Sequence, residues 1–516
     1  MKVNFYSIII LCILLISLFP LFFTNSNSFF LLKEKKVDHI DEGVLLQAFY
    51  WAVPDENWYS TIESRLSEID SLGITSLWLP PISKSYGNGP DSNGLQMGYE
   101  PFDYYDIGEF DQQGSIKTRF GNKSDLESLV QQTKKFNMSL IADIILNHNR
   151  GGNPLPNGLD FTNVSSGLFL RNASHFNCGD GPSFADFPDL CTTDPYVRQE
   201  LIKWGKWLQS ELGFDGWRFD YVKGFNKSTV KAWMDEIGGS GIIEYWDRDT
   251  TTILNYLQDF SIDTKAFDFP LLYNLREILI SNGNFDMRNL DKQGVSIYST
   301  ISNRAIPFVT NHDTVRDIHS NIPLHRDFMY AYILMQDVMP SIFWRDLYPD
   351  DECFGGLEIC SEQLDIQSDK LKNNLRNLLL IRKDFAKGSG TTLFSNNDLY
   401  VYQRNGDPGL VLILNDNPRE SYQVNFTSKW QNSILYDLTG KFKAVITNEY
   451  GETSMNIPPL EYAIYSFLDK PTSEVITDIQ IFESEKTNGN KTTNYSNIII
   501  ILISLISCII YSKLRH

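Results

Sequence analysis

Four short segments, far apart in the chain, each place an acidic or imidazole side chain at the end of an apolar run. These segments are DIILNH (143–148), GWRFD (216–220), IIEYW (242–246) and FVTNHD (308–313). A parallel barrel brings the carboxyl ends of all its strands to one rim. We therefore expect three carboxylates, an arginine and two histidines to share one cleft.

The carboxylates of this cleft suit cleavage of a glycosidic bond, in which one carboxyl group protonates the leaving oxygen and another meets the cationic centre. Arg218 and Asp220 are two positions apart, so on a strand they share a face, and Arg218 is expected to hold Asp220 ionised as a nucleophile. Glu244 follows two isoleucines, and apolar surroundings raise the pKa of a general acid. His148 and His312 each follow an asparagine and could donate to sugar hydroxyls.

The segments that must position these groups alternate between apolar strands and amphipathic helices. Strands are expected at 44–49, 74–79, 139–146, 216–219, 241–243, 266–269, 306–310 and 340–343, and helices include 58–72, 125–136, 194–212 and 327–338. This alternation predicts an α/β fold, a (β/α)8 TIM barrel, over residues 42–385. Residues 150–190 are too long for one βα unit, so they predict a loop-rich inserted subdomain after strand 3, held by a disulfide, a metal ion or both.

Beyond the barrel the pattern changes to short β-rich runs at 399–403, 410–414, 421–426 and 462–468. They predict a C-terminal antiparallel β-sandwich over residues 386–470, followed by a polar stalk over 471–497. The net charge of −19 argues against nucleic acid as a partner, because binding its backbone needs a basic face.

Both ends of the chain carry apolar runs. Residues 8–23 predict a secretory signal peptide over 1–28, with a retained signal anchor as the alternative. Residues 498–511 fall short of the about 20 residues that cross a bilayer. Lys513 and Arg515 nevertheless favour a single-pass membrane anchor over the alternative, a lipid-anchor signal. We expect a monomeric catalytic ectodomain on the lumenal or extracellular side of an organelle membrane or the cell surface.

Cysteines and sequons fit passage through the secretory pathway. Four cysteines outside the apolar ends, Cys178, Cys191, Cys353 and Cys360, allow three pairings, and proximity favours Cys178–Cys191 and Cys353–Cys360. Asn-x-Ser/Thr sequons recur along the chain. They include Asn163, Asn172, Asn226, Asn425, Asn490 and Asn494.

In this order, the four segments resemble the signature regions of the α-amylase family of glycoside hydrolases, above all its archaeal and plant calcium-dependent members. The resemblance spans residues 42–470 and extends to LLQAFYW (45–51), LWLPP (77–81), MGYEPFDYYDIGEFDQQGSIKTRFG (97–121) and FDYVKGF (219–225). It implies retaining endo-hydrolysis of α-1,4-glucosidic bonds in starch- or glycogen-type glucans. One departure is Ile243, where these relatives usually carry a small residue; its branched side chain could crowd the groove.

The resemblance implies a role for each matched residue. Asp220 would be the nucleophile, Glu244 the general acid/base and Asp313 a third carboxylate that grips substrate hydroxyls. Arg218 would orient the nucleophile. The residues implied to line the sugar site are Tyr99, His148, Lys223 and His312. Retention of anomeric configuration implies that the carboxyl groups of Asp220 and Glu244 lie about 5–5.5 Å apart.

A bound calcium ion is implied by the same resemblance. Its ligands would be the side chains of Asn147, Asp180 and Asp189 and the backbone carbonyls near Pro182 and at Gly224, hard oxygen donors of the kind that Ca2+ prefers.

Two alternatives to an endo-acting enzyme stay open. An α-glucosidase or glucanotransferase of the same family would share these motifs, because chain-length preference lies in loop shape. A non-catalytic, amylase-like membrane glycoprotein would be expected to have lost the catalytic acids or the arginine, and all of these are present here.

Overall fold

The structure is a computed structural model that describes residues 43–54, 56–86, 97–112, 114–150, 175–185, 187–291, 300–354 and 356–468. The predicted signal peptide, stalk and membrane anchor lie outside these residues, as does most of the predicted inserted subdomain. The chain divides into Met1–His39 and Ile40–His516, and every described residue belongs to the second unit. Among the described residues, no helix has both the length and the apolar character needed to span a membrane.

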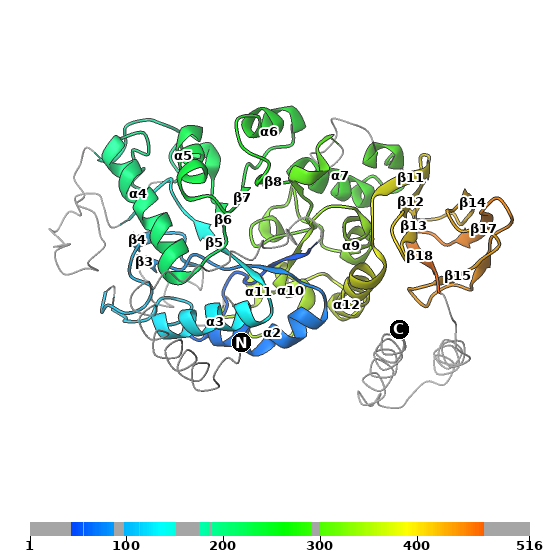
Figure 1. The fold of residues 1–516 in the computed structure, drawn as a ribbon, viewed down its shortest axis with the longest axis horizontal. Helices are drawn as coiled ribbons and strands as arrows, with labels where there is room; N and C mark the ends of the chain where they lie inside the picture. The colour runs from blue at the N-terminus through cyan, green and yellow to red at the C-terminus, as the bar shows by residue number, and fades with distance from the viewer. Residues whose placement is uncertain are drawn as a thin grey trace, which may run out of the picture. The chain divides into compact units, whose positions relative to one another are not determined.

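Eight parallel strands form the predicted barrel (Figure 1) in the spatial order β10-β1-β2-β5-β6-β7-β8-β9. The ring closes through a bridge between Phe308 and Ser341, where the Ser341 N–H donates to the carbonyl of Pro307 at 2.8 Å. The strands are β1 (Leu45–Gln47), β2 (Ser76–Trp78), β5 (Ser139–Ile144), β6 (Gly216–Phe219), β7 (Ser240–Ile243), β8 (Thr264–Phe267), β9 (Ala305–Ile306) and β10 (Ser341–Phe343). The predicted fold class is confirmed.

Helices follow the barrel strands, and their ends are fixed by local side-chain chemistry. Asn122 and Asp125 form a capping box at the start of α3, and Asp194 caps α4 in front of a proline at its first position, both strong helix-start signals. The helices are α2 (Trp58–Ser71), α3 (Lys123–Lys135), α4 (Pro195–Trp207), α5 (Lys227–Ile237), α6 (Thr250–Leu257), α7 (Phe269–Ile280), α9 (Arg326–Met335), α10 (Trp344–Leu347), α11 (Gly356–Glu362) and α12 (Ser368–Phe385).

Shorter helical turns and one hairpin complete the barrel region. A π-helical turn, η4 (Leu208–Leu212), extends α4. The 3₁₀ turns are η5 (Val222–Gly224), η6 (Met287–Leu290), η7 (Ser302–Arg304) and η8 (Thr314–Arg316), and strands β3 (Lys84–Ser85) and β4 (Pro101–Asp103) pair antiparallel. Disulfides Cys178–Cys191 and Cys353–Cys360 both form, which confirms the pairings that sequence proximity favours.

The C-terminal strands form two antiparallel sheets, as predicted. A six-stranded sheet has the order β11-β12-β13-β18-β15-β16, and β14 pairs with β17. The strands are β11 (Gly390–Ser395), β12 (Leu399–Arg404), β13 (Leu410–Asn415), β14 (Tyr422–Thr427), β15 (Ile434–Asp437), β16 (Val445–Ile446), β17 (Glu452–Ile457) and β18 (Glu461–Phe467).

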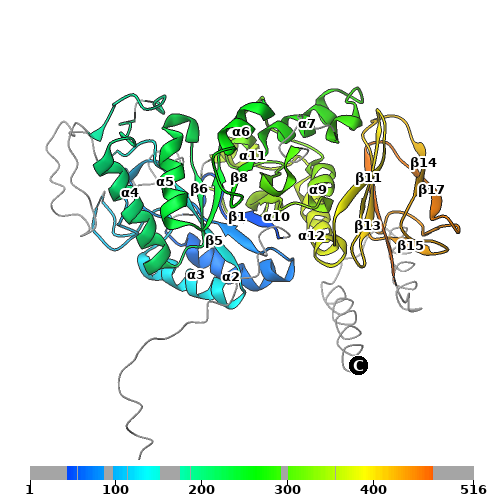
Figure 2. The ribbon, with the colours of Figure 1, turned by 45° about the horizontal axis from the view of Figure 1, so that its top comes forward.

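The large C-terminal sheet is buried on both faces. Figures 1 and 2 show its central strands beside α9 and α12. Leu410, Leu412 and Leu414 of β13 join the hydrophobic core of the barrel, whereas Val411 and Ile413 join a second core between the two sheets. Because successive strand residues point to opposite faces, a continuous apolar run is required to serve both cores.

Candidate active site

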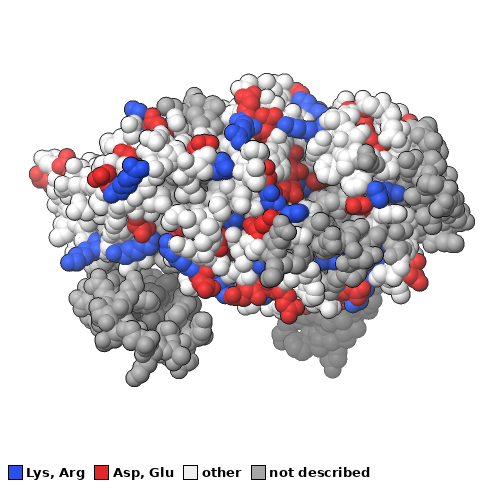
Figure 3. Space-filling view, turned by 180° about the vertical axis from the view of Figure 1, so that it is seen from behind, with Lys and Arg blue, Asp and Glu red and all other residues white. Residues whose placement is uncertain are grey.

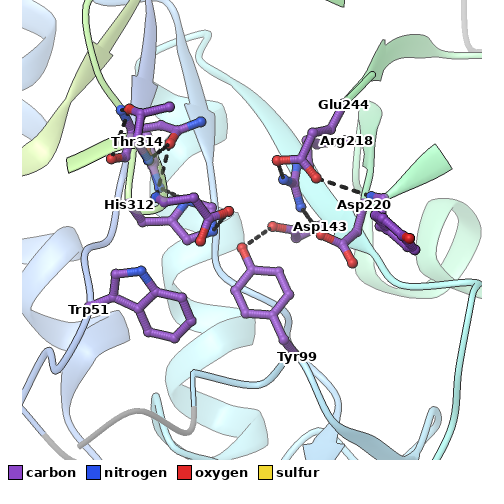
Figure 4. A network of polar contacts seen from close by, with 12 residues as sticks. Trp51, Tyr99, Asp143, Arg218, Asp220, Glu244, His312 and Thr314 are labelled. Carbon is purple, nitrogen blue, oxygen red and sulfur yellow. Dashed lines mark hydrogen bonds and ion pairs between the residues drawn. The ribbon is translucent and has the colours of Figure 1, made fainter. Parts of the chain in front are cut away.

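The guanidinium of Arg218 is the centre of the site. Its Nη1 donates to Oδ1 of Asp143 and to Oδ1 of Asp220, each at 2.8 Å, and its Nη2 pairs with Oε1 of Glu244 at 2.5 Å. Figure 4 shows these carboxylates turned toward the one cation. Three of the four sequence segments therefore meet at a single point.

The register of the barrel brings these residues together. Strands β5 and β6 pair with Asp143 opposite Arg218. Just past the ends of β6 and β7, the N–H groups of Asp220 and Glu244 continue the ladder, each bonding the preceding strand at 3.0 Å. Ile243, the last residue of β7, is fully buried in the hydrophobic core of the barrel, so its side chain packs in that core rather than in the groove.

Asp313, from the fourth segment, approaches from the turn after β9. The side chain of Asn311 accepts from the N–H groups of Asp313 and Thr314 at 2.9 and 2.8 Å, an Asx turn that fixes this backbone. One ring nitrogen of His312, Nε2, lies 3.2 Å from Oδ2 of Asp313.

Three carboxyl groups of the site, those of Asp143, Asp220 and Asp313, have raised pKa values. Burial raises the pKa of Asp220 well above its ordinary range; Arg218 opposes this, while neighbouring acids reinforce it. Burial and then the charge of Glu244 raise the pKa of Asp313 to about 7. The carboxyl groups of Asp143, Asp220, Glu244 and Asp313 thus form a coupled cluster with one guanidinium. Arg218 lowers the pKa of Asp220, the direction expected from the sequence, while burial and three neighbouring acids raise it.

An aromatic wall faces this cluster. The rings of Tyr99 and His312 stack with centroids 5.3 Å apart and planes 5° apart, and the hydroxyl of Tyr99 donates to Oδ2 of Asp143 at 2.8 Å. The ring of Trp51 lies 5.5 Å from that of His312 and 6.0 Å from that of Tyr99. Figure 4 shows Trp51 and Tyr99 side by side below His312. Such partly exposed rings suit the apolar faces of sugars.

The neutral form of His312 follows from its partners. Nε2 of Gln47 donates to Nδ1 of His312 at 2.8 Å, which leaves the imidazole proton on Nε2, facing Asp313. Burial and the positive charge of Arg218 lower the pKa of His312 well below its ordinary value. His312 thus presents a ring N–H donor beside Asp313.

His148 makes a different set of contacts. Its Nε2 lies 2.7 Å from the carbonyl of Tyr99 and must donate to it, while its Nδ1 lies 3.3 Å from the side-chain nitrogen of Asn147. Burial lowers the pKa of His148 to about 4, so the ring is neutral. Both ring nitrogens are engaged within the protein, which corrects the expectation that His148 donates to sugar hydroxyls. It holds the backbone of Tyr99 instead.

Lys223 lies away from the Arg218 cluster. Its ammonium pairs with Oδ2 of Asp247 at 2.8 Å and sits 4.8 Å from the ring centroid of Tyr245. These partners follow β7 closely, so Lys223 belongs to the same rim of the barrel. None of its described partners is one of the three predicted catalytic acids.

The predicted calcium ligands gather where the inserted segment meets the barrel. A Cβ at Gly181 would lie 2.1 Å from the carbonyl oxygen of Gly224, and a Cβ at Gly224 would lie 2.0 Å from Oδ1 of Asn147. The two glycines therefore let backbone and amide oxygens approach closely. Pro182 follows directly and is exposed.

The two carboxylates of this set carry an unbalanced charge. Oδ2 of Asp180 accepts from Oγ1 of Thr192 at 2.7 Å, whereas its Oδ1 is buried without a hydrogen-bond partner. Burial and the negative charge of Asp180 raise the pKa of Asp189 to about 6. A cation would relieve both features, so these residues fit a calcium ion. Among the described residues, no group of three or more His, Cys, Asp or Glu side chains could hold a metal, so any ion here depends on neutral oxygens as well.

Four residues of the site were assigned no role from sequence. Asp143 opens the first segment, and Gln47, Trp51 and Trp78 lie in strand-end motifs. Gln47 is only 1% exposed although it ends an apolar strand, and a polar residue in such a place usually serves a specific hydrogen bond. That pattern is the signal that could have identified it.

Comparisons with known proteins agree with this geometry. A family model described as "Alpha amylase, catalytic domain" matches residues 58–152. The α-amylase of Bacillus licheniformis is 24% identical over 494 residues, which cover 82% of this chain and 93% of that protein. The chain is thus similar to members of the α-amylase family over most of its length. The "probable alpha-amylase 2" of Arabidopsis thaliana is 27% identical to it over 338 residues, 59% of this chain and 75% of the plant protein.

The fold also matches those of solved structures. The α-amylase from Geobacillus thermoleovorans, complexed with acarbose, superposes with a TM-score of 0.62 at 20% identity, over 84% of this chain and 99% of that one. The narrower resemblance to archaeal and plant members is not supported. Bacterial relatives match a larger share of the chain than plant relatives do, at similar identity.

Proposed function

We propose that the protein is an α-amylase that cleaves internal α-1,4-glucosidic bonds of starch- or glycogen-type glucans with retention of configuration. The observation that carries this proposal is the single guanidinium of Arg218 bound to Asp143, Asp220 and Glu244. Glycosidic cleavage needs two carboxyl groups close together with opposite protonation states, and a coupled cluster of this kind can provide them.

In the proposed mechanism, Asp220 attacks the anomeric carbon while Glu244 protonates the leaving oxygen. A glycosyl ester on Asp220 forms as the glycosidic C–O bond breaks, and Glu244 then takes a proton from the water that hydrolyses the ester. Asp313 and the Nε2 proton of His312 would hold hydroxyls of the same glucose unit.

The charge distribution is compatible with a neutral substrate. On the face drawn in Figure 3, Lys and Arg alternate with Asp and Glu rather than gathering in one basic patch, and the net charge is −19. Nucleic acid remains an unsuitable partner on these grounds. An α-glucan needs hydrogen bonds and aromatic faces instead, and the α-amylase of similar fold was solved with acarbose.

The test of function is incubation of the purified protein with starch, maltotriose and maltose, followed by sizing of the products. An endo-acting amylase releases a range of maltooligosaccharides from starch and leaves maltose intact. Glucose as the main product from maltose would indicate an α-glucosidase, and products longer than the substrate would indicate a glucanotransferase. Failure to cleave any of these substrates would refute the proposal.

We further propose that a calcium ion binds the oxygens of Asn147, Asp180, Asp189 and Gly224 and a carbonyl near Pro182. The support is the buried, unpartnered Oδ1 of Asp180 and the mutual repulsion of the two aspartates. When bound, calcium would neutralise this charge and tie the inserted segment to the barrel. Within the chain, the side chain of Asn147 also bonds the ring of His148, and His148 in turn bonds the backbone of Tyr99.

The location of the enzyme is likewise a proposal. Two disulfides in the described chain support an oxidising compartment, with the apolar segment 498–511 as a membrane anchor. Alkaline carbonate should fail to extract such a protein from membranes, whereas a phospholipase that cleaves lipid anchors would release it only if the tail had been exchanged for a lipid. Full recovery in the soluble fraction would exclude both forms of anchoring.

A further inference from the structure

A short disulfide-closed segment lies beside the aromatic wall of the site. Its described residues, 353–354 and 356–363, form the rim segment, in which Cys353 is bonded to Cys360. It comes shortly after β10, the eighth strand of the barrel, and so belongs to the rim where the catalytic groups gather. Neither the length of this segment nor its disulfide bond has a part in the mechanism proposed above.

The rim segment holds the backbone of Trp51 on both sides. The fully buried side chain of Gln363 accepts from the N–H of Trp51 at 2.9 Å and donates to the carbonyl of Trp51 at 3.0 Å. The N–H of Phe354 donates to the carbonyl of Ala52, the next residue, at 3.0 Å. A buried amide with this fixed pair of bonds leaves the Trp51 backbone little freedom.

The ring of Trp51 is held by the same segment. The guanidinium of Arg316 lies 5.7 Å from the ring centroid of Trp51, and its Nε is 3.7 Å from a carboxylate oxygen of Glu362. The Trp51 ring also lies 5.5 Å from the ring of His312. Contacts therefore run without interruption from the sugar site, through Trp51, to the rim segment.

Phe354 is the exposed end of this series. Its side chain is 59% exposed, although its backbone is bonded one residue away from Trp51. An exposed apolar ring gains free energy when a ligand covers it. Glucose units present apolar C–H faces, so an α-1,4-glucan that extends past Trp51 would have the ring of Phe354 within the adjoining rim segment to cover.

We infer that the rim segment recognises the glucan chain beyond the units at the scissile bond, with Phe354 as a stacking platform and Gln363 as a positioning residue that acts through Trp51. This inference rests on the proposed α-glucan substrate. It predicts that contacts with the rim segment make the enzyme prefer long glucan chains over short ones.

The first test replaces Phe354, which is exposed and should not disturb folding. In Phe354→Ala, the ratio of kcat/KM for amylose to kcat/KM for maltotriose should fall about 3–10-fold, the range expected for loss of one aromatic contact. Phe354→Tyr should restore the ratio because it keeps the ring face. Tyr450→Ala is the matched control, since Tyr450 is 64% exposed but lies in the turn between β16 and β17. An unchanged ratio in Phe354→Ala would overturn the inference.

Binding separates this inference from the proposed activity. In a Glu244→Gln background, which should not turn over substrate, the Kd for maltoheptaose relative to that for maltotriose should rise about 3–10-fold on adding Phe354→Ala. The same rise in a protein whose parent cleaves no glucan would refute the amylase proposal and leave the inference standing. No change in relative Kd would refute the inference whether or not the parent is active.

The role of Gln363 has its own readout. Gln363→Met keeps the length of the side chain but loses both bonds to Trp51, so KM for maltotriose should rise more than kcat falls. Gln363→Glu keeps the acceptor for the Trp51 N–H and should rescue part of that rise. If Gln363→Met lowers only the melting temperature and leaves KM unchanged, its role is merely structural and this part of the inference fails.

Discussion

Replacing Asp143 with asparagine tests whether the carboxyl groups around Arg218 act as one titrating cluster. The substitution keeps an acceptor for the hydroxyl of Tyr99 and for the indole N–H of Trp78, which both bond Oδ2 of Asp143 at 2.8 and 3.0 Å. It removes one negative charge. That charge raises the pKa values of both Asp220 and Asp313, so its loss should lower both.

The size of the effect follows from the geometry. Oδ1 of Asp143 and Oδ1 of Asp220 are each 2.8 Å from the same nitrogen of Arg218, so they are at most twice that distance apart. At this separation two unit charges repel by about 3 kcal/mol at an effective dielectric constant of about 20. Because Arg218 and solvent screen part of this repulsion, we expect the alkaline limb of the kcat/KM profile to move about one unit toward lower pH.

The assay is the pH dependence of kcat/KM on a soluble oligosaccharide, between about pH 4 and 9. The matched control is Asp346→Asn, because Asp346 is also a buried acid bonded to an arginine and a tyrosine, Arg326 and Tyr330, in a separate cluster from that of Arg218. A profile of Asp143→Asn that does not move, or moves toward higher pH, would refute the coupled cluster. An equal movement in Asp346→Asn would assign the effect to general destabilisation.

Three further predictions concern catalysis, calcium and pH stability. Asp220→Asn and Glu244→Gln should each lower kcat by at least about 10²–10⁴-fold with a melting temperature near that of the parent; activity near the parent level in either would remove that residue from the mechanism. A chelator should lower the melting temperature of the parent protein, because bound calcium adds about 2.7 kcal/mol to the free energy of unfolding per hundredfold excess of calcium over Kd. Asp180→Asn should lose this sensitivity to the chelator. An unchanged melting curve of the metal-free parent would argue against the site. Burial, and then the charge of Asp398, raise the pKa of the 1%-exposed Asp416 to about 8, above the about 3.9 of an unfolded chain, so the stability that its neutral form provides is present below about pH 4 and is lost as the pH rises through about 8. In the presence of a chelator, Asp416→Asn should therefore raise the melting temperature at pH 9 but hardly change it at pH 4. An equal gain in melting temperature at both pH values would contradict this reasoning.

The barrel could be predicted from the sequence because each strand is an apolar run followed by a helix with clear start signals. The eight strands occur in the expected order, although several are shorter than the apolar runs that predict them, as with β9. In the C-terminal region, four strands lie outside the predicted runs. β11 (GTTLFS) and β17 (ETSMNI) carry many polar residues, and β15 and β16 are only 4 and 2 residues long, too short to stand out as apolar runs.

The candidate site, like the fold, could be predicted from the sequence only in part. Asp220, Glu244, Asp313 and Arg218 were predicted to meet because strand ends of one barrel share a rim, and they do. What sequence could not supply was the balance among them, since the pKa of each acid depends on burial and on its neighbours in space. The contacts of His148 were missed for a related reason, because its partner, the carbonyl of Tyr99, belongs to backbone whose path no side-chain pattern reveals.

The attachment of the C-terminal sheets has a practical consequence for making fragments of this enzyme. Arg404 reaches across from β12 to the carbonyls of Met335 and Gln336 at the end of α9, at 3.3 and 2.7 Å, and Arg382 donates to Gln336 from the barrel side at 3.0 Å. A catalytic barrel expressed alone, ending at residue 385, would lose the hydrogen bonds from Arg404. It would also expose to solvent the apolar surface that β13 covers. Such a fragment should aggregate, so the sandwich is best regarded as an outer wall of the enzyme and not as a detachable module.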